Sequence, residues 1–479
     1  MSFGIVTNFN MDHGKPSLSG AFNKLPIELN QLVAHNLDLD SDIIHFGLAC
    51  KEAHNAIWQD RYSFWRIRFR EKYDLPQDMV DNRAIVILYR DRAWIFNKGI
   101  TVKFEYGRTR KEIKVIEALK GLILESFKGS KRKCNDNGHC LNQQAIVKFL
   151  LASRYFMNIR ELPSPNSEMP VSEVLGAIRI MCAQLMLEMD GPRYDILSFD
   201  DSQKLVYSHW RTEPIFYGHS TLHVNMKWVL HCLNFFRHHM IKEEAGTLRS
   251  TMIDQEDSQK PTAWRSIVEE SSHASAVSRH WKGTYAFIDP RELQQLRSRR
   301  NNDDSIFVDQ NIDQGEKSIQ ELTLDCVKTG ELPWPTYFEN RLQSLKGTMP
   351  PRTRAQHRAP RVDGKENVSI RLSGEGRDQG DDFFASGWLN PLVPQGSIAG
   401  WQRVTFMKHF EDLDQATTDD LWAYEGVVLP GGRIMVGRWW YASGDCKSLD
   451  WGDNSGPFIL WAVEAPPVVE SDDHDDDNE

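Results

Sequence analysis

The sequence has few cysteines, no long apolar run and no basic excess. Its 479 residues include seven cysteines, an odd number scattered along the chain, which fits reduced thiols better than a disulfide framework. No stretch reaches the roughly 18 apolar residues of a membrane span, and Met1 to Pro16 is polar rather than signal-like. We therefore expect a cytoplasmic or nuclear protein with no membrane association.

Strong charge of one sign is also missing. The formal net charge is -10, and much of the acid lies in Ser471 to Glu479. Basic clusters such as Lys131-Arg132-Lys133 and Arg297-Ser298-Arg299-Arg300 are short. Nucleic-acid binding needs an extended basic surface, so no nucleic-acid partner is expected.

Signatures of an active site are missing too. The sequence has neither a Gly-x-Ser-x-Gly elbow nor a phosphate-binding loop. Cys134 and Cys140 with His139 are half of a zinc site, and no second pair has matching spacing. His219 and His223, expected on one helical face, lack the glutamate of a metalloprotease motif. We predict no catalytic residue, no metal and no cofactor.

The chain is nevertheless rich enough in apolar residues to fold. Hydrophobic residues make up 40% of it, and 15 are tryptophan. Its length predicts two or three domains, and the fold class is α+β multidomain. The expected parts are a flexible lead (1–22), a three-helix unit (23–70), a helical domain (71–244), a linker (245–279), a β-rich sandwich or barrel-like domain (280–465) and a disordered acidic tail (466–479).

Helical spacing begins near Leu25. The apolar residues Leu25, Leu29, Leu32, Val33 and Leu37 fall on one helical face. Pro26 suits the first turn of such a helix. The pattern after Asp40 predicts two further short helices.

After His280, short apolar runs separated by turn-forming residues predict β-strands. Leu421 to Leu429 and Arg433 to Tyr441 flank Pro430-Gly431-Gly432, which predicts a hairpin. A third strand is expected over Phe458 to Val463, whereas Gly374 to Asp382 reads as a loop. Alternation along the second arm sends Trp439 and Trp440 to opposite faces.

The N-terminal pattern resembles the F-box family. That pattern begins with a Leu-Pro pair followed by Glu, continues with an aliphatic helix and a Cys-Lys pair, and closes with a Trp. The matching residues are Leu25, Pro26, Ile27, Glu28, Leu29, Leu37, Leu48, Ala49, Cys50, Lys51 and Trp65.

The resemblance implies a partner. In the family, a three-helix unit leaves an apolar surface that a Skp-type adaptor buries by helix packing, and the adaptor connects it to a cullin-RING ubiquitin ligase. The implied adaptor-binding residues are Leu25, Pro26, Ile27, Leu29, Leu37, Cys50, Lys51 and, at the far rim, Trp65. The chain would then be the non-catalytic substrate adaptor of an SCF-type ligase.

The remainder is similar to large F-box proteins of filamentous fungi with an aromatic-rich C-terminal module. The similar segments are His280 to Tyr285, Gly387 to Asn390, Gly400 to Arg403 and Gly437 to Tyr441. This module would capture an unknown protein substrate. Because Trp and Arg dominate binding hot spots, the candidate contact residues are Arg433, Arg438, Trp439 and Trp440.

Two alternatives stay open at this point. The chain could bind a Skp-type adaptor outside any ligase, as some F-box proteins do. It could instead be an enzyme or small-ligand binder with its site in the C-terminal β domain or in the His-rich helices. A bound metal, or a pocket lined by His219, His223 or Trp439, would favour that reading.

Overall fold

The computed structural model describes most of the chain, in two compact units. The described residues are 25–59, 62–129, 134–157, 171–188, 197–218, 221–242, 247–268, 275–298, 307–312, 319–327, 358–362, 365–410, 420–442 and 454–465. The expected flexible lead (1–22) and acidic tail (466–479) lie outside them. The units are Met1–Ala93 and Trp94–Glu479, and each is treated by itself.

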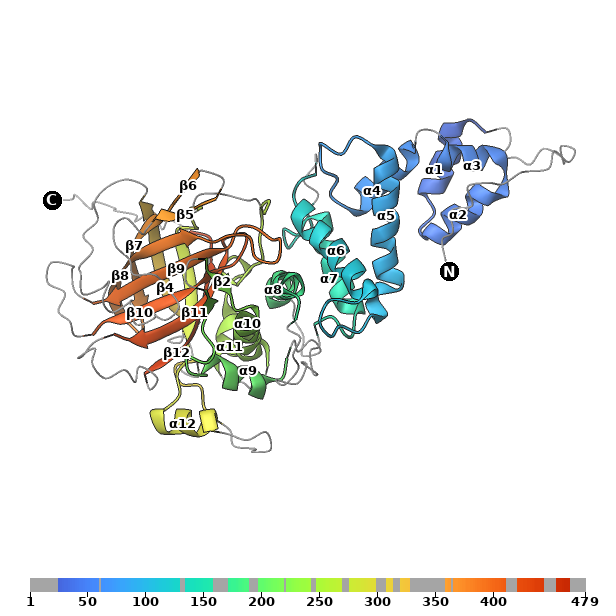
Figure 1. Cartoon of the computed structure of the whole chain (residues 1–479). Coiled ribbons are helices and arrows are strands. Elements are labelled where there is room, and N and C mark those ends of the chain that lie inside the picture. Colours follow the sequence, from blue (N-terminus) through green and yellow to red (C-terminus); the bar gives the residue numbers. More distant parts are fainter. Residues whose placement is uncertain are drawn as a thin grey trace, which may run out of the picture. The chain divides into compact units, whose positions relative to one another are not determined.

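The first unit is helical (Figure 1). Its helices are α1 (Ile27–His35), α2 (Asp40–Ala49), α3 (Lys51–Trp58), α4 (Ser63–Lys72) and α5 (Asn82–Asn97), the last of which continues into the second unit. Cys50 separates α2 from α3 because its backbone is extended, and its Sγ accepts a hydrogen bond from the Ala53 N–H at 3.4 Å. That contact caps α3 at its first turn.

Aromatic side chains and one carboxylate hold the first unit together. Trp65 packs against Trp58, Phe64 and Tyr89 with ring centroids 5.1–5.3 Å apart. Asp40, in the first turn of α2, accepts hydrogen bonds from Lys72 Nζ at 2.9 Å and from the Tyr89 hydroxyl at 2.8 Å. These contacts tie α2 to both α4 and α5.

The second unit begins with helices and short strands. In order these are η2 (Gly99–Thr101), α6 (Arg110–Glu125), α7 (Leu141–Ala152), α8 (Glu173–Leu187), α9 (Phe199–Val206), β1 (Phe216–Tyr217), β2 (His223–Val224), α10 (Met226–Ile241), α11 (Thr247–Asp254) and η4 (Asp257–Gln259). Most residues of α8 and α10 are buried, which is expected of helices that are apolar on several sides.

Glu112 fixes the start of α6. Its carboxylate accepts backbone hydrogen bonds from Glu105, Gly107, Arg108 and Thr109 at 2.7–3.2 Å. In return the Glu112 N–H donates to Thr109 Oγ1, which completes a capping box. The turn before α6 therefore has its backbone donors satisfied by one side chain.

Glu188 joins three segments of the second unit just after α8. Its carboxylate accepts hydrogen bonds from His139 Nε2 at 3.0 Å, Arg265 Nη2 at 2.6 Å and the Ala263 N–H at 2.5 Å. Burial alone would raise the pKa of Glu188, but these donors stabilise the carboxylate and lower the pKa overall. The side chain is therefore a charged anchor.

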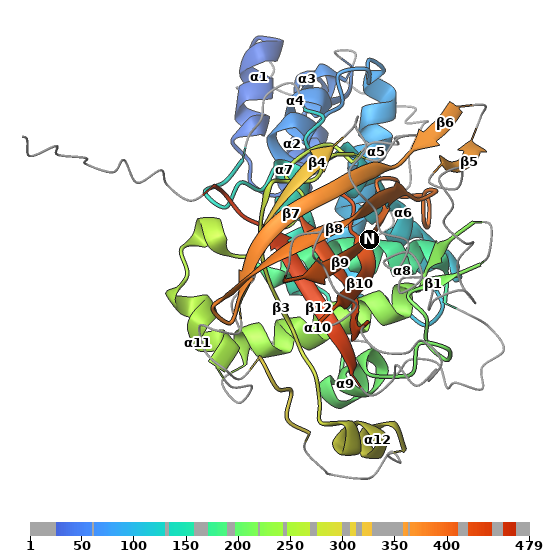
Figure 2. The ribbon, with the colours of Figure 1, turned by 90° about the vertical axis from the view of Figure 1, so that its left-hand side faces the viewer.

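The C-terminal strands form a closed eight-stranded barrel (Figure 2). They are β3 (His280–Tyr285), β4 (Gln320–Val327), β7 (Ile370–Asp378), β8 (Asp381–Pro391), β9 (Gln402–His409), β10 (Trp422–Val428), β11 (Ile434–Tyr441) and β12 (Ser455–Ala462). Every neighbouring pair is antiparallel, and β12 pairs with β3 to close the ring. In the sequence, helix α12 (Pro290–Ser298) follows β3 and precedes β4. The hairpin of β5 (Arg358–Val362) and β6 (Lys365–Val368) follows β4 and precedes β7.

Large apolar side chains fill the barrel beside glycines. Tyr424 stacks on Phe406 at 4.5 Å and meets the Phe458 ring at 5.1 Å. A Cβ on Gly437 would lie 2.6 Å from Phe458 and 2.1 Å from the carbonyl oxygen of Glu425. The strand registers place the following glycines on the inward face: Gly283, Gly374, Gly376, Gly387, Gly426, Gly437 and Gly456. These positions leave the room that the rings occupy.

Helix α10 contacts the outside of the barrel at β11 and β12 (Figure 1). The guanidinium of Arg438 lies 4.9 Å from the Trp228 ring of this helix. On the same outer face, Arg403 and Glu425 form an ion pair at 2.6 Å with both side chains 2% exposed. The barrel wall is thus buried on both sides here.

The predicted fold class is confirmed at the level of a multidomain α+β protein, and the β-rich part is a barrel. The hairpin is also confirmed, since β10 and β11 flank a turn in which Gly431 and Gly432 have φ of 95° and 68°. The predicted third strand corresponds to β12.

Two expectations differ from the structure. The predicted loop Gly374–Asp382 is wrong, because β7 continues to Asp378 and a tight turn at Gln379-Gly380 leads into β8. The predicted linker (245–279) contains α11, and its Trp264 is fully buried. Polar composition concealed both; in β7, for example, Glu375 and Arg377 are exposed.

No helix among the described residues is long and apolar enough to cross a membrane.

Replacing glycine by alanine should change the free energy of unfolding in opposite directions at an inward barrel position and at a helix position. Gly437→Ala should lower the free energy of unfolding by about 1–3 kcal/mol, because the added methyl overlaps Phe458 and the Glu425 carbonyl. Gly121→Ala in α6 should raise it by roughly 0.5–1 kcal/mol, because its Cβ meets only the Glu125 side chain at 3.6 Å. Chemical denaturation of both variants checks this, and equal effects would contradict the packing described.

Glu188 gives a pH-dependent prediction. Its folded-state pKa lies below the ordinary 4.5, so the carboxylate adds stability above pH 4.5 that is lost as pH falls through the folded-state value. Glu188→Gln should therefore cost about 1–3 kcal/mol at neutral pH and less in acid. Glu117→Gln, which removes an exposed pair with Lys120, is the matched control and should change stability little. A constant cost of Glu188→Gln across the acid range would contradict the assignment.

Candidate partner-binding surface

The first unit exposes large aliphatic side chains on α1 and around α2. The exposed fractions are 37% for Ile27, 45% for Leu29, 57% for Leu32, 61% for Leu39 and 67% for Leu48. We call these five residues the aliphatic surface. Leu29 and Leu32 lie three residues apart, so they are neighbours on α1.

The inward side of α1 is small and polar instead. Its buried residues are Asn30 and Ala34. Asn30 donates to the Leu25 carbonyl at 3.2 Å, and Gln31 donates to the Ala56 carbonyl of α3 at 2.9 Å. A helix that serves only its own core turns its leucines inward, whereas α1 turns Leu29 and Leu32 outward.

This inversion has an energetic consequence. Burying one leucine side chain fully is worth about 1.5–3 kcal/mol relative to leaving it in water. Soluble monomers rarely expose large apolar patches without a binding role. Leu29 and Leu32 keep 45% and 57% of their surface exposed. Removing these side chains from water would therefore be favourable.

Three other positions of the N-terminal pattern flank α1 in the sequence. Leu25 and Leu37 are half-buried, and Pro26 is exposed just before α1. Arg68 Nη2 donates to the carbonyls of Leu37 and Asp38 at 3.0 and 3.1 Å. The α1–α2 turn is therefore held by a buried cation of α4.

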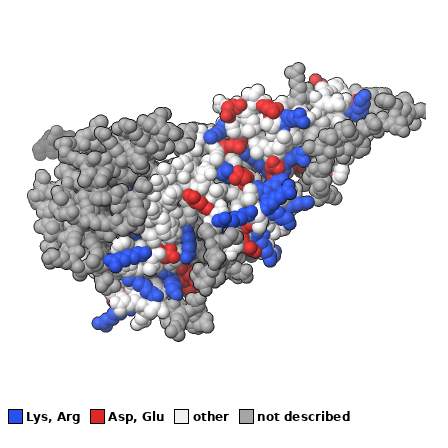
Figure 3. Space-filling model, viewed as in Figure 1, with Lys and Arg blue, Asp and Glu red and all other residues white. Residues whose placement is uncertain are grey.

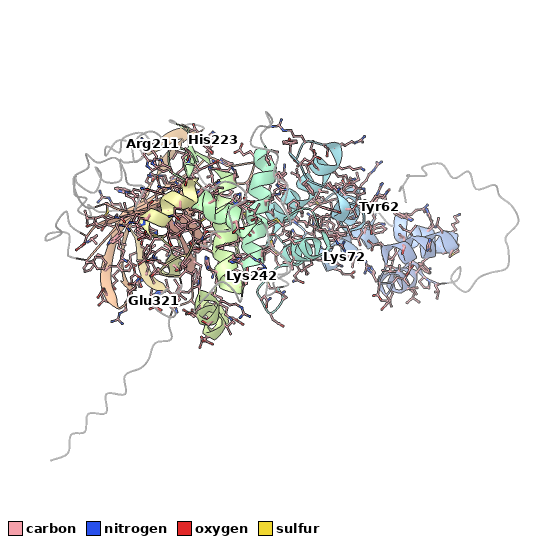
Figure 4. The ribbon with its side chains drawn as sticks, turned by 90° about the horizontal axis from the view of Figure 1, so that it is seen from below. Tyr62, Lys72, Arg211, His223, Lys242 and Glu321 are labelled. Carbon is pink, nitrogen blue, oxygen red and sulfur yellow. The ribbon has the colours of Figure 1, made fainter. Side chains whose placement is uncertain are left out.

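Cys50 and Lys51 lie at the start of α3. Cys50 is half-buried and caps the helix through its sulfur, while Lys51 is exposed. Figure 4 labels Tyr62, just before α4, and Lys72 at the end of α4. Lys51 remains available to a partner, and Cys50 has a structural role.

Trp65 corrects one expectation. It was expected at the rim of the surface, but it is 4% exposed and packs among Trp58, Phe64 and Tyr89. The aromatic spacing of α4 serves the core of the unit. Trp65 thus supports the surface from within.

Two of the predicted substrate contacts are arginines held by the second unit. Arg433 donates to Thr262 Oγ1 at 2.6 Å and to the Ala462 carbonyl at 3.2 Å. Arg438 is 8% exposed, stacks on Trp228 and donates to Ser208 Oγ at 3.4 Å. Burial lowers the pKa of Arg438 to about 10. Both join the barrel to neighbouring segments.

The two tryptophans of β11 are also buried, and this corrects their assignment as partner contacts. Trp439 points into the barrel, where its Nε1 donates to the Ala286 carbonyl at 3.1 Å. Trp440 points outward, as alternation predicts, yet it is only 6% exposed. The expectation assumed that one face of the hairpin meets solvent, whereas helices cover that face.

The barrel contains a buried ion pair that was not predicted from the sequence. Lys408 points inward and donates to Asp378, and its Nζ lies 4.3 Å from the centre of the Phe383 ring. Burial lowers the pKa of Lys408, and Asp378 opposes that effect. The only available signal was alternation, which places residue 408 on the face of Val404 and Phe406. Glu321, labelled in Figure 4, is exposed on the outer face of β4.

The histidine-rich region does not assemble a metal site among the described residues. His223 (Figure 4) lies in the strand β2, so the expectation of a helical face shared with His219 is wrong; His219 itself lies outside the described residues. His239 faces Asp309 at 3.0 Å, and the Tyr207 hydroxyl donates to the same carboxylate at 2.8 Å. These contacts fasten the segment 307–312 to α9 and α10.

Charges of both signs are interspersed on the described part of the face shown in Figure 3. Comparison with known proteins gave no family model, no curated protein and no solved structure that matches this chain. The proposed function below therefore rests on the aliphatic surface of the first unit.

The position of Trp65 gives a test of its role. Trp65→Ala should lower the free energy of unfolding of the first unit by about 3–5 kcal/mol, because it empties a fully packed aromatic cluster. Ile67→Ala on the same helix is the control; with 45% of the side chain exposed it should cost little. Hydrogen exchange over residues 27–92 would measure both. A Trp65→Ala variant as protected as Ile67→Ala would contradict the burial.

Proposed function

We propose that this chain is an F-box adaptor that docks a Skp-type protein on the aliphatic surface and recruits a target for a cullin-RING ubiquitin ligase. The observation that carries the proposal is the inversion of α1, whose leucines face outward while Asn30 and Ala34 face inward. The F-box pattern independently marks Leu25, Pro26, Ile27 and Leu29 as adaptor-facing.

The proposed partner chemistry follows from the surface. A partner that packs apolar helices against Leu29 and Leu32 would remove their exposed area from water, and this burial would drive association. Charged groups at the edge, such as Lys51, would set orientation more than affinity. This chain would need no reactive group for that role, because ligation chemistry would come from the cullin-bound RING and its conjugating enzyme.

The role that we propose for the second unit is inferred from its position in the chain after the first unit. An adaptor must hold a target near the conjugating enzyme, and this contribution is proximity rather than bond chemistry. The barrel and its helices would offer the capture surface. Arg438, Trp439 and Trp440 are buried and Arg433 is half-buried, which supports looking for that surface elsewhere on the unit.

Leu29→Asp combined with Leu32→Asp tests the docking proposal. Both side chains are exposed, so the variant should fold, yet two buried charges should weaken binding of a purified Skp-type adaptor by at least about 30-fold, or about 2 kcal/mol. Calorimetric titration measures the affinity. Ile253→Asp in α11, an isoleucine 58% exposed, is the matched control and should bind normally.

Purification from cells of the intact chain beside the double variant extends the test. Co-purification of adaptor and cullin with the intact chain, and of neither with the variant, supports the ligase role. Adaptor without cullin would favour a Skp-bound function outside the ligase. Unchanged adaptor binding by the folded double variant would contradict the surface, and no binding by the intact chain would refute the F-box proposal.

A further inference from the structure

Cys134 and Cys140 form a pair that the proposed function does not use. They lie directly opposite each other in an isolated antiparallel bridge. The Asn135 N–H donates to the His139 carbonyl at 3.0 Å, inside the bridge. The two cysteines therefore occupy a non-hydrogen-bonded position, where facing Cα atoms are about 4.5 Å apart. This spacing lies at the close end of the range that a disulfide spans.

The turn between the cysteines is well defined. The Gly138 N–H donates to the Asn135 carbonyl at 2.9 Å, and the His139 N–H donates to Asn135 Oδ1 at 2.8 Å. Gly138 has a φ of 73°, which a residue without Cβ adopts easily. The pair is thus presented by a fixed hairpin.

Access and helix position differ between the two thiols. Cys134 is exposed, so an oxidant in solution reaches it. Cys140 is buried at the N-terminus of α7. By contrast, Cys182 and Cys232 are fully buried, and burial raises the pKa of both thiols. Among the described cysteines, this is the pair whose members face each other, and Cys134 is its solvent-exposed member.

Zinc does not explain the pair. His139, in the same hairpin, is turned to Glu188 at 3.0 Å, and the described residues offer no group of three metal ligands here. A structural zinc ion needs four ligands.

We propose that Cys134 and Cys140 are a redox modification site that closes to a reversible disulfide. With hydrogen peroxide, the Cys134 thiolate attacks one oxygen and becomes a sulfenic acid, while hydroxide leaves and is protonated to water. The Cys140 thiolate then attacks the Cys134 sulfur, forms the S–S bond and releases a second hydroxide. Two thiols and one peroxide thus give one disulfide and two waters, and a dithiol reductant reverses the change.

The closed form would lock a junction of the second unit. The same hairpin supplies His139 to Glu188, and the Asn137 carbonyl accepts a hydrogen bond from Arg265 at 2.9 Å. Arg265 and Ala263 also bond to Glu188. A disulfide restricts the unfolded chain, so oxidation would make the start of α7 and these contacts more resistant to opening.

Peroxide treatment of the intact chain followed by peptide mapping tests the site. The expected result is a Cys134–Cys140 cross-link that a dithiol removes, with slower hydrogen exchange over 134–145. Cys134→Ser and Cys140→Ser should each abolish the cross-link, and serine keeps a capping oxygen at the α7 N-terminus. Cys326→Ser is the control and should cross-link like the parent.

Two outcomes would overturn the proposal. One is oxidation of Cys134 to sulfinic acid, or its linkage to a second molecule, without the internal disulfide. The other is a 134–140 cross-link that appears only after the chain is denatured. Neither outcome bears on adaptor binding, so the redox site and the proposed function stand or fall separately.

Discussion

Closure of the barrel by β12 and β3 is the constraint on which the second unit depends. The strands pair from Phe458↔Tyr285 to Ala462↔Trp281, joining residues that are far apart in the chain. Once closed, the barrel has no strand edge to protect from aggregation. Closure also draws eight strands around a narrow interior, whose inward positions combine large side chains with glycines. The requirement for glycine opposite rings such as Phe458 follows from that geometry.

The same closure explains why polar groups are buried on both faces of the wall. Lys408 cannot reach water from the interior and is neutralised by Asp378, while the outer pair of Arg403 and Glu425 is equally buried. An unpaired charge in either place would cost several kcal/mol. These pairs account for arginines and lysines in strands that otherwise look like core.

The sequence predicted elements that depend on local patterns and missed those that depend on tertiary cover. Helix α8 and the β10–β11 hairpin carry their own periodicity and turn glycines, so their existence could be read from the residues. The inside and outside of β11 could be assigned as well, because alternation separates Trp439 from Trp440. What covers the outside could not, since α10 lies about two hundred residues earlier. Trp65 illustrates the same limit, because a matching motif position says nothing of the neighbours that α4 and α5 supply.

The proposed docking surface is independent of those misassignments. It depends on α1, where Leu29 and Leu32 of the apolar pattern predicted from Leu25 to Leu37 face outward, while Leu25, Val33 and Leu37 are half-buried. The sequence alone locates that stripe but not its direction, because an isolated helical pattern has no inside. Direction is set by Asn30, Ala34 and Gln31, whose small size and hydrogen bonds allow α1 to lie close to its neighbours. Because α1 packs on its own unit through amide contacts, its leucines are left exposed.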